Sequence, residues 1–323
     1  MKEIYSYFGE LLSPANYVTP ENFGAVGDGQ TDDTNAFLNM LAGGNKIAFL
    51  SPKTYKLSGV INVYSNTIIF GNGATFISNR PIFMTGETGN YAYGYQGTKN
   101  VIIRDVTLDI NYTQTDHIIL AHSENILLYN CTLKNNVEHS IELNSSLNVT
   151  IENCKFINIA PVDRIPEGRQ MEAINIDPAH TGATLNMGYF DDTISDYSKI
   201  INCYFENCWC PIGNHNETPY ASQNILFIGN EIRNCFRGGQ FHSYGNIHIA
   251  NNKFNVSEIA LRFIGANNIK VDSNIFYTDD TTISLESTTE NVIITGNIIN
   301  TENETPILNG TTTTPIIANN LIA

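Results

Sequence analysis

The chain has 323 residues, 32 acidic against 17 basic, a formal net charge of −15, 42% apolar residues and 15% charged residues. The apolar fraction is too high for a disordered chain, six cysteines are too few for a disulfide-stapled scaffold, and the acidic balance disfavours a nucleic-acid partner. No run approaches the roughly 18 apolar residues of a membrane span.

The first 20 residues are read as a lead-in, followed by one domain from 21 to 323. The lead-in shows neither the apolar stretch nor the cleavage site of a signal peptide. Residues 21–37 (ENFGAVGDGQTDDTNAF) combine turn-forming glycines with N-cap chemistry for a short helix. We therefore assign Asp28, Asp32 and Asp33 a structural role.

An Asn followed by alternating apolar residues recurs every 22 to 25 residues, apart from one gap of 76 that holds another copy and an insertion. Strand-type alternation at this period predicts one solenoid coil per repeat, and the missing Leu frame of leucine-rich repeats favours an all-β parallel β-helix. An open solenoid end needs a cap, which the short N-terminal helix can supply. The copies begin at Asn100, Asn125, Asn148, Asn224, Asn246, Asn268 and Asn291.

Stacked coils bring equivalent residues into columns about 4.8 Å apart. One predicted core column is Leu108, Leu133, Phe156, Phe205, Ile232, Phe254, Phe276, Ile299 and Ile322. The column two residues earlier is Val106, Cys131, Cys154, Cys203, Asn230, Asn252, Asn274, Asn297 and Asn320. We interpret its cysteines as small buried apolar residues rather than metal ligands or disulfides, and its asparagines as an amide ladder with left-handed backbone.

The opening motif resembles that of the pectate-lyase-like right-handed parallel β-helix superfamily. Residues 18–34 (VTPENFGAVGDGQTDDT) are similar to the entry segment of bacteriophage and prophage tail-associated depolymerases. The resemblance implies a right-handed, single-stranded solenoid and a carbohydrate substrate, and leaves hydrolase, lyase, epimerase or non-catalytic function open. It also implies an extracellular or virion-associated protein, and we expect a homotrimer.

A second strand follows each core strand, and its outward residues predict two further columns. One is Ile119, Glu142, Asn175, Gly213, Gln240, Arg262 and Ser284, and the other is Ala121, Asn144, Asp177, His215, His242, Ile264 and Glu286. The alternation places Ile212 and Asn214 inward. Asp177, His215 and His242 are therefore expected on successive coils.

The insertion at about 157–199 flanks the Asp177 strand, and long loops on a rigid solenoid are where binding function concentrates. We expect a substrate groove here, although the outward columns alone could be a solvated face. The insertion brings Asp163, Arg164, Glu167, Arg169, Glu172 and His180.

Glycoside hydrolysis needs one protonated and one ionised carboxyl group. Asp177 is the first choice, with His215 as the neighbour that tunes it, and the second carboxyl is Glu142, Glu172 or Glu167. Strand geometry places Glu142 and Asp177 about 8 Å apart at Cα, which suits inversion. Predicted substrate contacts are Asn175, His242, Gln240, Arg262, Arg169, Arg164 and Asn144.

The segment from Asn175 to Asp177 also resembles the N-x-D strand of polygalacturonase-type hydrolases, although their paired aspartates, G-H-G and R-I-K are missing. Arg262 is loosely similar in place to their substrate arginine, or it is an ion-pair partner of Glu286 or Glu258. His215 and His242 can equally be side chains at the groove edge, Glu142 a surface carboxylate and Glu172 a loop carboxylate. Tyr91, Tyr93 and Tyr95 either stack on sugar rings or pack an edge of the early coils.

Three functions stay open at this stage. A hydrolase acting on a bacterial polysaccharide needs no cofactor and ranks first. A polysaccharide lyase ranks second, because an acidic groove repels uronates unless Ca²⁺ bridges them. The third is a glycan-binding module that cleaves nothing. The last coil fragment is expected to be covered by a further segment or by another subunit.

Overall fold

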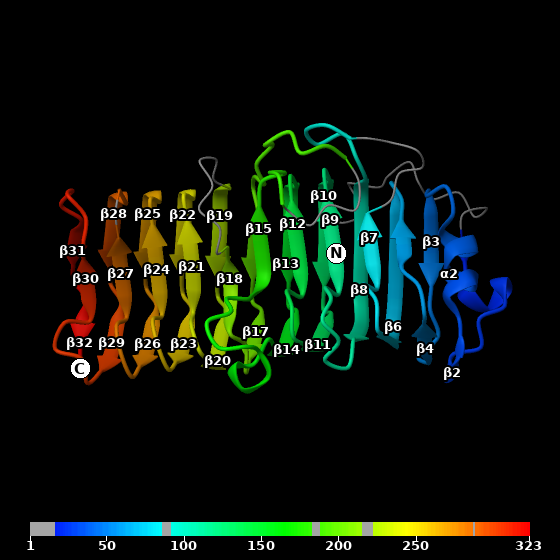
Figure 1. Cartoon of the computed structure of the whole chain (residues 1–323), viewed down its shortest axis with the longest axis horizontal. Coiled ribbons are helices and arrows are strands. Elements are labelled where there is room, and N and C mark those ends of the chain that lie inside the picture. Colours follow the sequence, from blue (N-terminus) through cyan, green and yellow to red (C-terminus); the bar gives the residue numbers. More distant parts are fainter. Residues whose placement is uncertain (1–16, 86–91, 183–187, 215–221, 287) are drawn as a thin grey trace.

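The computed structural model describes residues 17–85, 92–182, 188–214, 222–286 and 288–323. Figure 1 shows its strands stacked along one long axis, with helix α2 (Thr34–Leu41) at one end. Every strand pairing in these ranges is parallel, and the chain winds as a right-handed, all-β solenoid of about 12 turns. The predicted β-helix is confirmed, while the capping role of α2 stays a prediction.

The strands form two sheets. The ten-stranded sheet contains β5 (Ile61–Val63), β7 (Phe83–Thr85), β9 (Ile118–Ala121), β12 (Ile141–Asn144), β15 (Glu172–Asp177), β18 (Cys210–Gly213), β21 (Gly239–His242), β24 (Leu261–Ile264), β27 (Ile283–Glu286) and β30 (Ile307–Asn309).

The 22-stranded sheet has two parallel rows that share the long strands β6 (Thr67–Ser78) and β8 (Lys99–Asp109). The first row also contains β1 (Tyr17–Val18), β3 (Lys46–Phe49), β10 (Glu124–Tyr129), β13 (Leu147–Glu152), β16 (Lys199–Ile201), β19 (Gln223–Ile228), β22 (Gly245–Ala250), β25 (Asn267–Asp272), β28 (Glu290–Thr295) and β31 (Ile316–Ala318). The second row also contains β2 (Asp28–Asp32), β4 (Thr54–Leu57), β11 (Thr132–Asn136), β14 (Lys155–Ile159), β17 (Tyr204–Glu206), β20 (Glu231–Cys235), β23 (Lys253–Val256), β26 (Ile275–Thr278), β29 (Ile298–Thr301) and β32 (Leu321–Ile322).

The described residues also form two short 3₁₀ helices, η2 (Pro20–Phe23) and η3 (Val162–Arg164). β1, which falls within the predicted lead-in, pairs in register with β3. No helix in the described part of the chain is long and apolar enough to cross a membrane.

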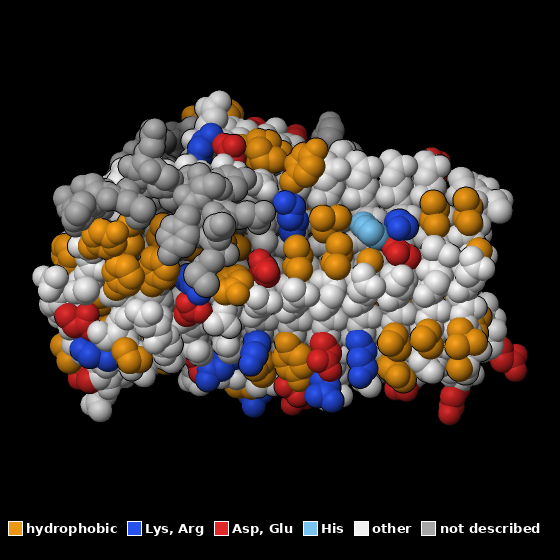
Figure 2. Space-filling view, turned by 180° about the vertical axis from the view of Figure 1, so that it is seen from behind, with side chains coloured by type: hydrophobic (Ala, Val, Ile, Leu, Met, Phe, Trp, Pro, Cys, Tyr) orange, Lys and Arg blue, Asp and Glu red, His pale blue; other side chains and the backbone are white. Residues whose placement is uncertain are grey.

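The Asn that opens each repeat lies near the start of a first-row strand and takes a left-handed backbone. Asn125, Asn148 and Asn246 have φ of 58°, 55° and 54°, a region that Asn enters more readily than other residues with a side chain. Their amides form a ladder: the Nδ2 of Asn125 donates to Asn100 Oδ1 at 3.1 Å, and that of Asn148 donates to Asn125 Oδ1 at 2.8 Å. In Figure 2, which shows the molecule from behind, charged side chains of both signs gather mainly along the lower edge, and hydrophobic side chains lie exposed beside them.

The predicted inner amide column is also a ladder, but its backbone differs from the prediction. Asn252 donates from Nδ2 to Asn274 Oδ1 at 3.0 Å and to the carbonyl of Phe227 at 2.8 Å. The left-handed residue is the one before each ladder asparagine, such as Asn251 with φ 56°. The turn therefore ends one residue earlier than predicted, and the ladder asparagine points inward from the following position.

The predicted core column is buried as far as Ile299, whereas Ile322 is exposed. Its aromatic members stack, with ring centroids 4.7 Å apart for Phe156 and Phe205 and 4.9 Å for Phe254 and Phe276. All six cysteines are buried and unpaired with one another. They pack as apolar residues, as predicted.

The aspartates of the opening motif hold backbone and hydroxyl groups in place. Asp33 accepts the N–H groups of Val26 and Gly27 at 2.7 and 3.1 Å. Asp32 accepts the Thr34 N–H at 3.1 Å, and its hydrogen bonds with Ser58 and Thr34 lower its pKa to about 2. These contacts support the structural role predicted for the motif.

Asn252→Ala tests the inner ladder, because it removes the acceptor of a buried N–H of Asn230 (2.8 Å) and a donor to a buried carbonyl. Leaving such groups unsatisfied costs about 2–4 kcal/mol of unfolding free energy in total. Urea unfolding followed by circular dichroism measures the loss. Asn255→Ala, an exposed position on the same coil, is the matched control and is expected to change stability little. Equal effects of the two variants would contradict a stabilising ladder.

Candidate functional site

Strand register brings the predicted outward columns together. β12 and β15 place Glu142 beside Asn175 and Asn144 beside Asp177. The first column continues through Gly213, Gln240, Arg262 and Ser284, and the second resumes with His242, Ile264 and Glu286. His215 and Tyr91 lie outside the described residues.

One amide joins two carboxylates at the centre of these columns. Asn175 donates from Nδ2 to Glu142 Oε2 at 2.9 Å and to Asp177 Oδ2 at 3.1 Å. Glu142, Asn175 and Asp177 are 3%, 3% and 2% exposed. Because both oxygens contact the same nitrogen, they are at most about 6 Å apart.

Asp177 is held as an ionised carboxylate. Its Oδ2 lies 3.9 Å from His180 Nε2, and its Oδ1 accepts the Asn214 amide at 3.3 Å. Burial pushes the pKa of Asp177 upward, but the interactions with His180, Asn175 and Asn214 outweigh burial and bring the pKa below its ordinary value. The same contact with Asp177 raises the pKa of His180.

Asn214 corrects the predicted alternation, which placed it inward beside Ile212. Its amide reaches Asp177, and its Oδ1 accepts the His242 N–H at 2.9 Å. The cause is Gly213, whose φ of +143° ends the extended alternation of side chains. Only glycine fits at this position, because a Cβ there would lie 1.7 Å from the Gln240 carbonyl oxygen. A glycine at the end of a strand was the sequence signal for this turn.

His139, which the sequence analysis missed, lies between two of the predicted carboxylates. Its Nε2 is 3.7 Å from Glu142 Oε1, and its Nδ1 is 3.7 Å from Glu172 Oε2. Glu172 is fully buried at the start of β15. The structure thus brings Glu172 and Glu142 to one imidazole, and the spacing His139-x-x-Glu142 was the available signal.

Asp116 is a second missed residue of this cluster. It precedes β9 at the position that His139 occupies before β12, because Ile118 pairs with Ile141. Asp116 is 9% exposed, and burial, followed by the negative charge of Glu142, raises its pKa well above the ordinary value. Aligning the two repeats would have placed Asp116 next to His139.

The predicted arginines make contacts within the protein. Arg262 binds Glu286 through both carboxylate oxygens at 2.8 and 2.9 Å, which is the ion pair that the sequence left open as an alternative. Arg169 pairs with Glu138, and the Arg164 guanidinium lies 3.9 Å from the centre of the half-buried Tyr112 ring. These contacts leave the predicted substrate-binding role of the arginines a prediction.

Gln240, His242 and Asn144 are buried on the same face. Gln240 donates from Nε2 to Gln170 Oε1 at 2.7 Å, which links the sheet to the first half of the insertion. Glu167 and Asp163, the other loop carboxylates, are exposed.

An aromatic pair joins two loops near the second half of the insertion. The rings of Tyr93 and Tyr189 stack with centroids 4.1 Å apart, and both remain exposed, as does Phe190. The His122 imidazole connects the loops, with Nδ1 2.7 Å from the Gly94 carbonyl oxygen and Nε2 3.0 Å from that of Tyr189. The insertion therefore carries an exposed aromatic surface.

The sequence is similar to those of several known proteins. The family model "Adenovirus EB1 55K protein / large t-antigen" matches residues 22–171. The pre-neck appendage protein of Bacillus phage B103 is 27% identical over 73% of this chain and 28% of its own length. Plasmin and fibronectin-binding protein A of Streptococcus pneumoniae is 25% identical over 72% of this chain and 38% of its own length. The chain thus spans well under half of either relative.

Among solved structures, the S. pneumoniae surface adhesin PfbA aligns with a TM-score of 0.75 and 20% identity, covering 88% of this chain and 80% of the adhesin. The tailspike of E. coli bacteriophage HK620, crystallised with a pentasaccharide, aligns with a TM-score of 0.67 and 14% identity over 96% of this chain and 67% of the tailspike. The chain has the parallel β-helix fold of phage tailspikes.

The lowered pKa of Asp177 predicts that this residue contributes to the free energy of unfolding at neutral pH and that acid removes the contribution. The unfolded chain holds the Asp177 proton more tightly, so this contribution is present above the ordinary carboxyl pKa of about 4 and is lost as pH falls through the lower folded value. Urea unfolding of wild type and Asp177→Asn between about pH 2.5 and about pH 7 tests it. We expect the advantage of the wild type to shrink below about pH 4. His180→Ala should weaken this pH dependence, and a pH-independent difference would contradict the assignment.

Proposed function

We propose that the chain is the glycan-binding and glycan-cleaving coil segment of a virion-associated tail protein, a glycoside hydrolase acting on a bacterial surface polysaccharide. The match to a phage pre-neck appendage protein supports the virion setting, and the tailspike crystallised with a pentasaccharide supports the ligand class. Assembly as a homotrimer is part of the same proposal.

The observation that carries the proposal is the pair of carboxylates held by one amide. Asn175 fixes Glu142 and Asp177 on adjacent coils with their oxygens at most about 6 Å apart. Retaining glycosidases hold their two carboxyl groups about 5 Å apart, and inverting enzymes about 6.5 to 9.5 Å. The spacing favours a retaining reaction rather than the inversion expected from Cα positions.

The cluster also separates the two protonation states that the reaction needs. Asp177, with its lowered pKa, serves as the ionised nucleophile or base. We assign the proton donor to the pair of Glu142 and Asp116, because burial and the acidic neighbour raise the pKa of Asp116 and so favour its protonated form. Glu142 connects the two, because its charge acts on Asp116 and it shares the Asn175 amide with Asp177.

The loops around β15 provide the remaining parts of a binding surface. Exposed stacked rings, such as Tyr93 and Tyr189, offer flat faces for the apolar side of a pyranose. Such exposed apolar patches on a protein surface mark interaction sites. We assign this aromatic surface to substrate binding.

A lyase is the weaker proposal. Proton abstraction beside a uronate requires a cation to neutralise the substrate carboxylate. Arg262, the arginine predicted to contact substrate on this face, is engaged by both oxygens of Glu286. A Ca²⁺ ion would have to supply the charge instead, and it belongs to this alternative alone.

A glycan-binding module without catalysis is the second candidate. Its specific support is burial: Asp177 and Glu142 are 2% and 3% exposed, and Glu172 is fully covered. The match to a binding protein and the fold shared with an adhesin point the same way. Product analysis separates the two functions.

Asp177→Asn is expected to abolish cleavage while leaving polysaccharide binding in place, because the amide keeps the shape but loses the charge. Removing a nucleophile or base lowers the rate by about 10³-fold or more. A reducing-end assay on bacterial capsular and wall polysaccharides, with absorbance near 230 nm recorded in parallel, measures cleavage and detects the unsaturated product of a lyase.

Glu290→Gln, an exposed carboxylate on β28, is the matched control and should retain full activity. Full activity of Asp177→Asn would remove Asp177 from the mechanism. Binding without new reducing ends in the wild type would establish the non-catalytic module instead.

A further inference from the structure

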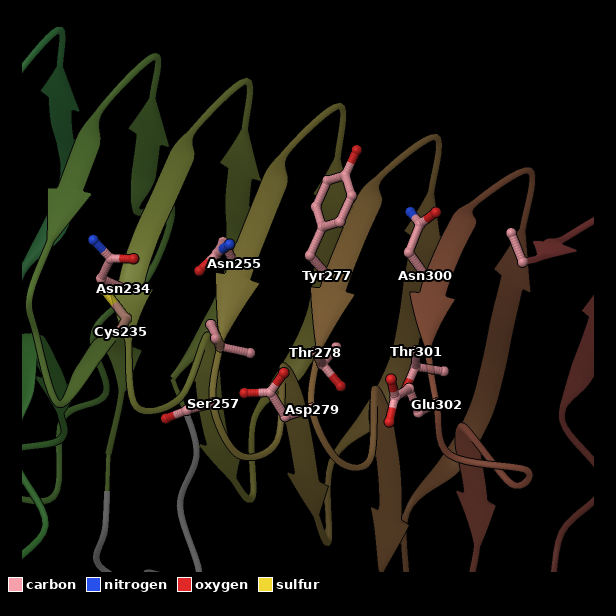
Figure 3. A pocket seen from close by; sticks show the side chains of 12 residues that line it. Asn234, Cys235, Asn255, Ser257, Tyr277, Thr278, Asp279, Asn300, Thr301 and Glu302 are labelled. Carbon is pink, nitrogen blue, oxygen red and sulfur yellow. The ribbon is translucent and has the colours of Figure 1, made fainter.

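A second groove lies on the C-terminal half of the solenoid, away from the cluster around Asp177. It follows the ends of β20, β23, β26 and β29, where each coil turns toward the ten-stranded sheet (Figure 3). Its volume is about 850 Å³, which is in the range of ligand sites of about 300–1,000 Å³. The groove therefore crosses several successive coils.

The groove presents the same kind of polar group from coil to coil. Asn255, Tyr277 and Asn300 are direct neighbours across β23, β26 and β29, and Thr278 is the neighbour of Thr301. Strand stacking repeats these groups about every 4.8 Å. A ligand that lies across the coils thus meets the side-chain oxygens of Asn255, Tyr277 and Asn300 at regular intervals. The hydroxyls of Thr278 and Thr301 donate to the Asp280 carbonyl, and the Asn300 amide donates to that of Phe276.

Tyr277 supplies the aromatic surface of the groove. Its side chain projects from β26 in Figure 3, and the residue is 42% exposed. The Lys253 ammonium is 5.9 Å from the ring centre, toward the neighbouring coil. An exposed ring flanked by the amides of Asn255 and Asn300 matches the mixed apolar and hydroxyl character of a pyranose.

Charge defines which sugar fits. Asp279 and Glu302 are exposed on adjacent coils, and both line the groove. Its lining contains no Lys or Arg, so the Lys253 ammonium beside the Tyr277 ring opposes two carboxylates. A uronate or a phosphate-bearing glycan would be repelled by these carboxylates. An uncharged sugar instead finds hydrogen-bond acceptors for its hydroxyl groups.

We propose that this groove is a second, non-catalytic binding site for an uncharged linear oligosaccharide lying across the coils. The groove would bind the same class of ligand as the proposed catalytic site, but the two sites have no residue in common. The two sites are therefore separable by mutation.

Saturation-transfer NMR of the full chain tests the groove with uncharged hexasaccharides of N-acetylglucosamine, glucose, galactose and mannose. An oligogalacturonate and a hexalysine peptide serve as acidic and basic probes. At least one uncharged hexasaccharide is expected to bind, and Tyr277→Ala should weaken that binding at least tenfold. Tyr197→Ala, at an exposed tyrosine outside the groove, is the matched control and should bind normally.

Asp177→Asn separates this proposal from the proposed function, because it should leave Tyr277-dependent binding intact even where cleavage is lost. Asn255→Ala, expected to fold normally, should also weaken binding. The groove proposal is overturned if no uncharged hexasaccharide binds, if binding does not depend on Tyr277 and Asn255, or if hexalysine alone binds in a Tyr277-dependent manner.

Discussion

Strand stacking at one fixed spacing is the constraint on which the whole molecule depends. Each coil must offer hydrogen-bond donors and acceptors that match those of the coils above and below it, because it makes few hydrogen bonds within itself. The two amide ladders show this requirement in side chains: the outer one donates toward the N-terminus, from Asn148 to Asn125, and the inner one toward the C-terminus, from Asn252 to Asn274. A buried group without its partner costs about 1–3 kcal/mol, so the repeat tolerates little variation at these positions.

The candidate site is built where this regularity is interrupted. The insertion adds loops on both sides of β15, and Gly213 ends the alternation of β18. Residues of the insertion lie against the polar face of the ten-stranded sheet, His180 beside Asp177 and Gln170 beside Gln240, and the carboxylates of Glu142 and Asp177 are buried there. Covering them changes their chemistry, because in a buried site a charge depends on its specific partners rather than on water. Regular coils thus supply positions, and irregular loops supply the environment.

The sequence predicted most of the fold because a period of 22 to 25 residues determines which residues are neighbours. The period alone predicts that Glu142 lies beside Asn175 and Asn144 beside Asp177, as the strand register confirms. It failed at Asn214, because the backbone of a glycine does not follow strand alternation.

The period also overlooked His139 and Asp116. Both lie in turns before strands, where strand alternation gives no information on which way a side chain points. The path of the inserted loops, which buries the cluster, has no periodicity from which it could be predicted. Nor does strand pairing specify which carboxyl group carries a proton, since this depends on contacts that only the folded loops create.

The inner amide ladder carries a consequence for how such a chain can vary in length. From Asn230 onward every coil offers the next the same acceptor and the same donor. If one complete coil in this half were duplicated or deleted, the asparagines of the new neighbours would still pair with each other. The contact in which Cys203 donates its N–H to Asn230 joins a cysteine coil to an asparagine coil and has no such equivalent. The amide half is therefore an extensible module, and the thiol half, with its inserted loops, is the part whose dimensions the site keeps constant.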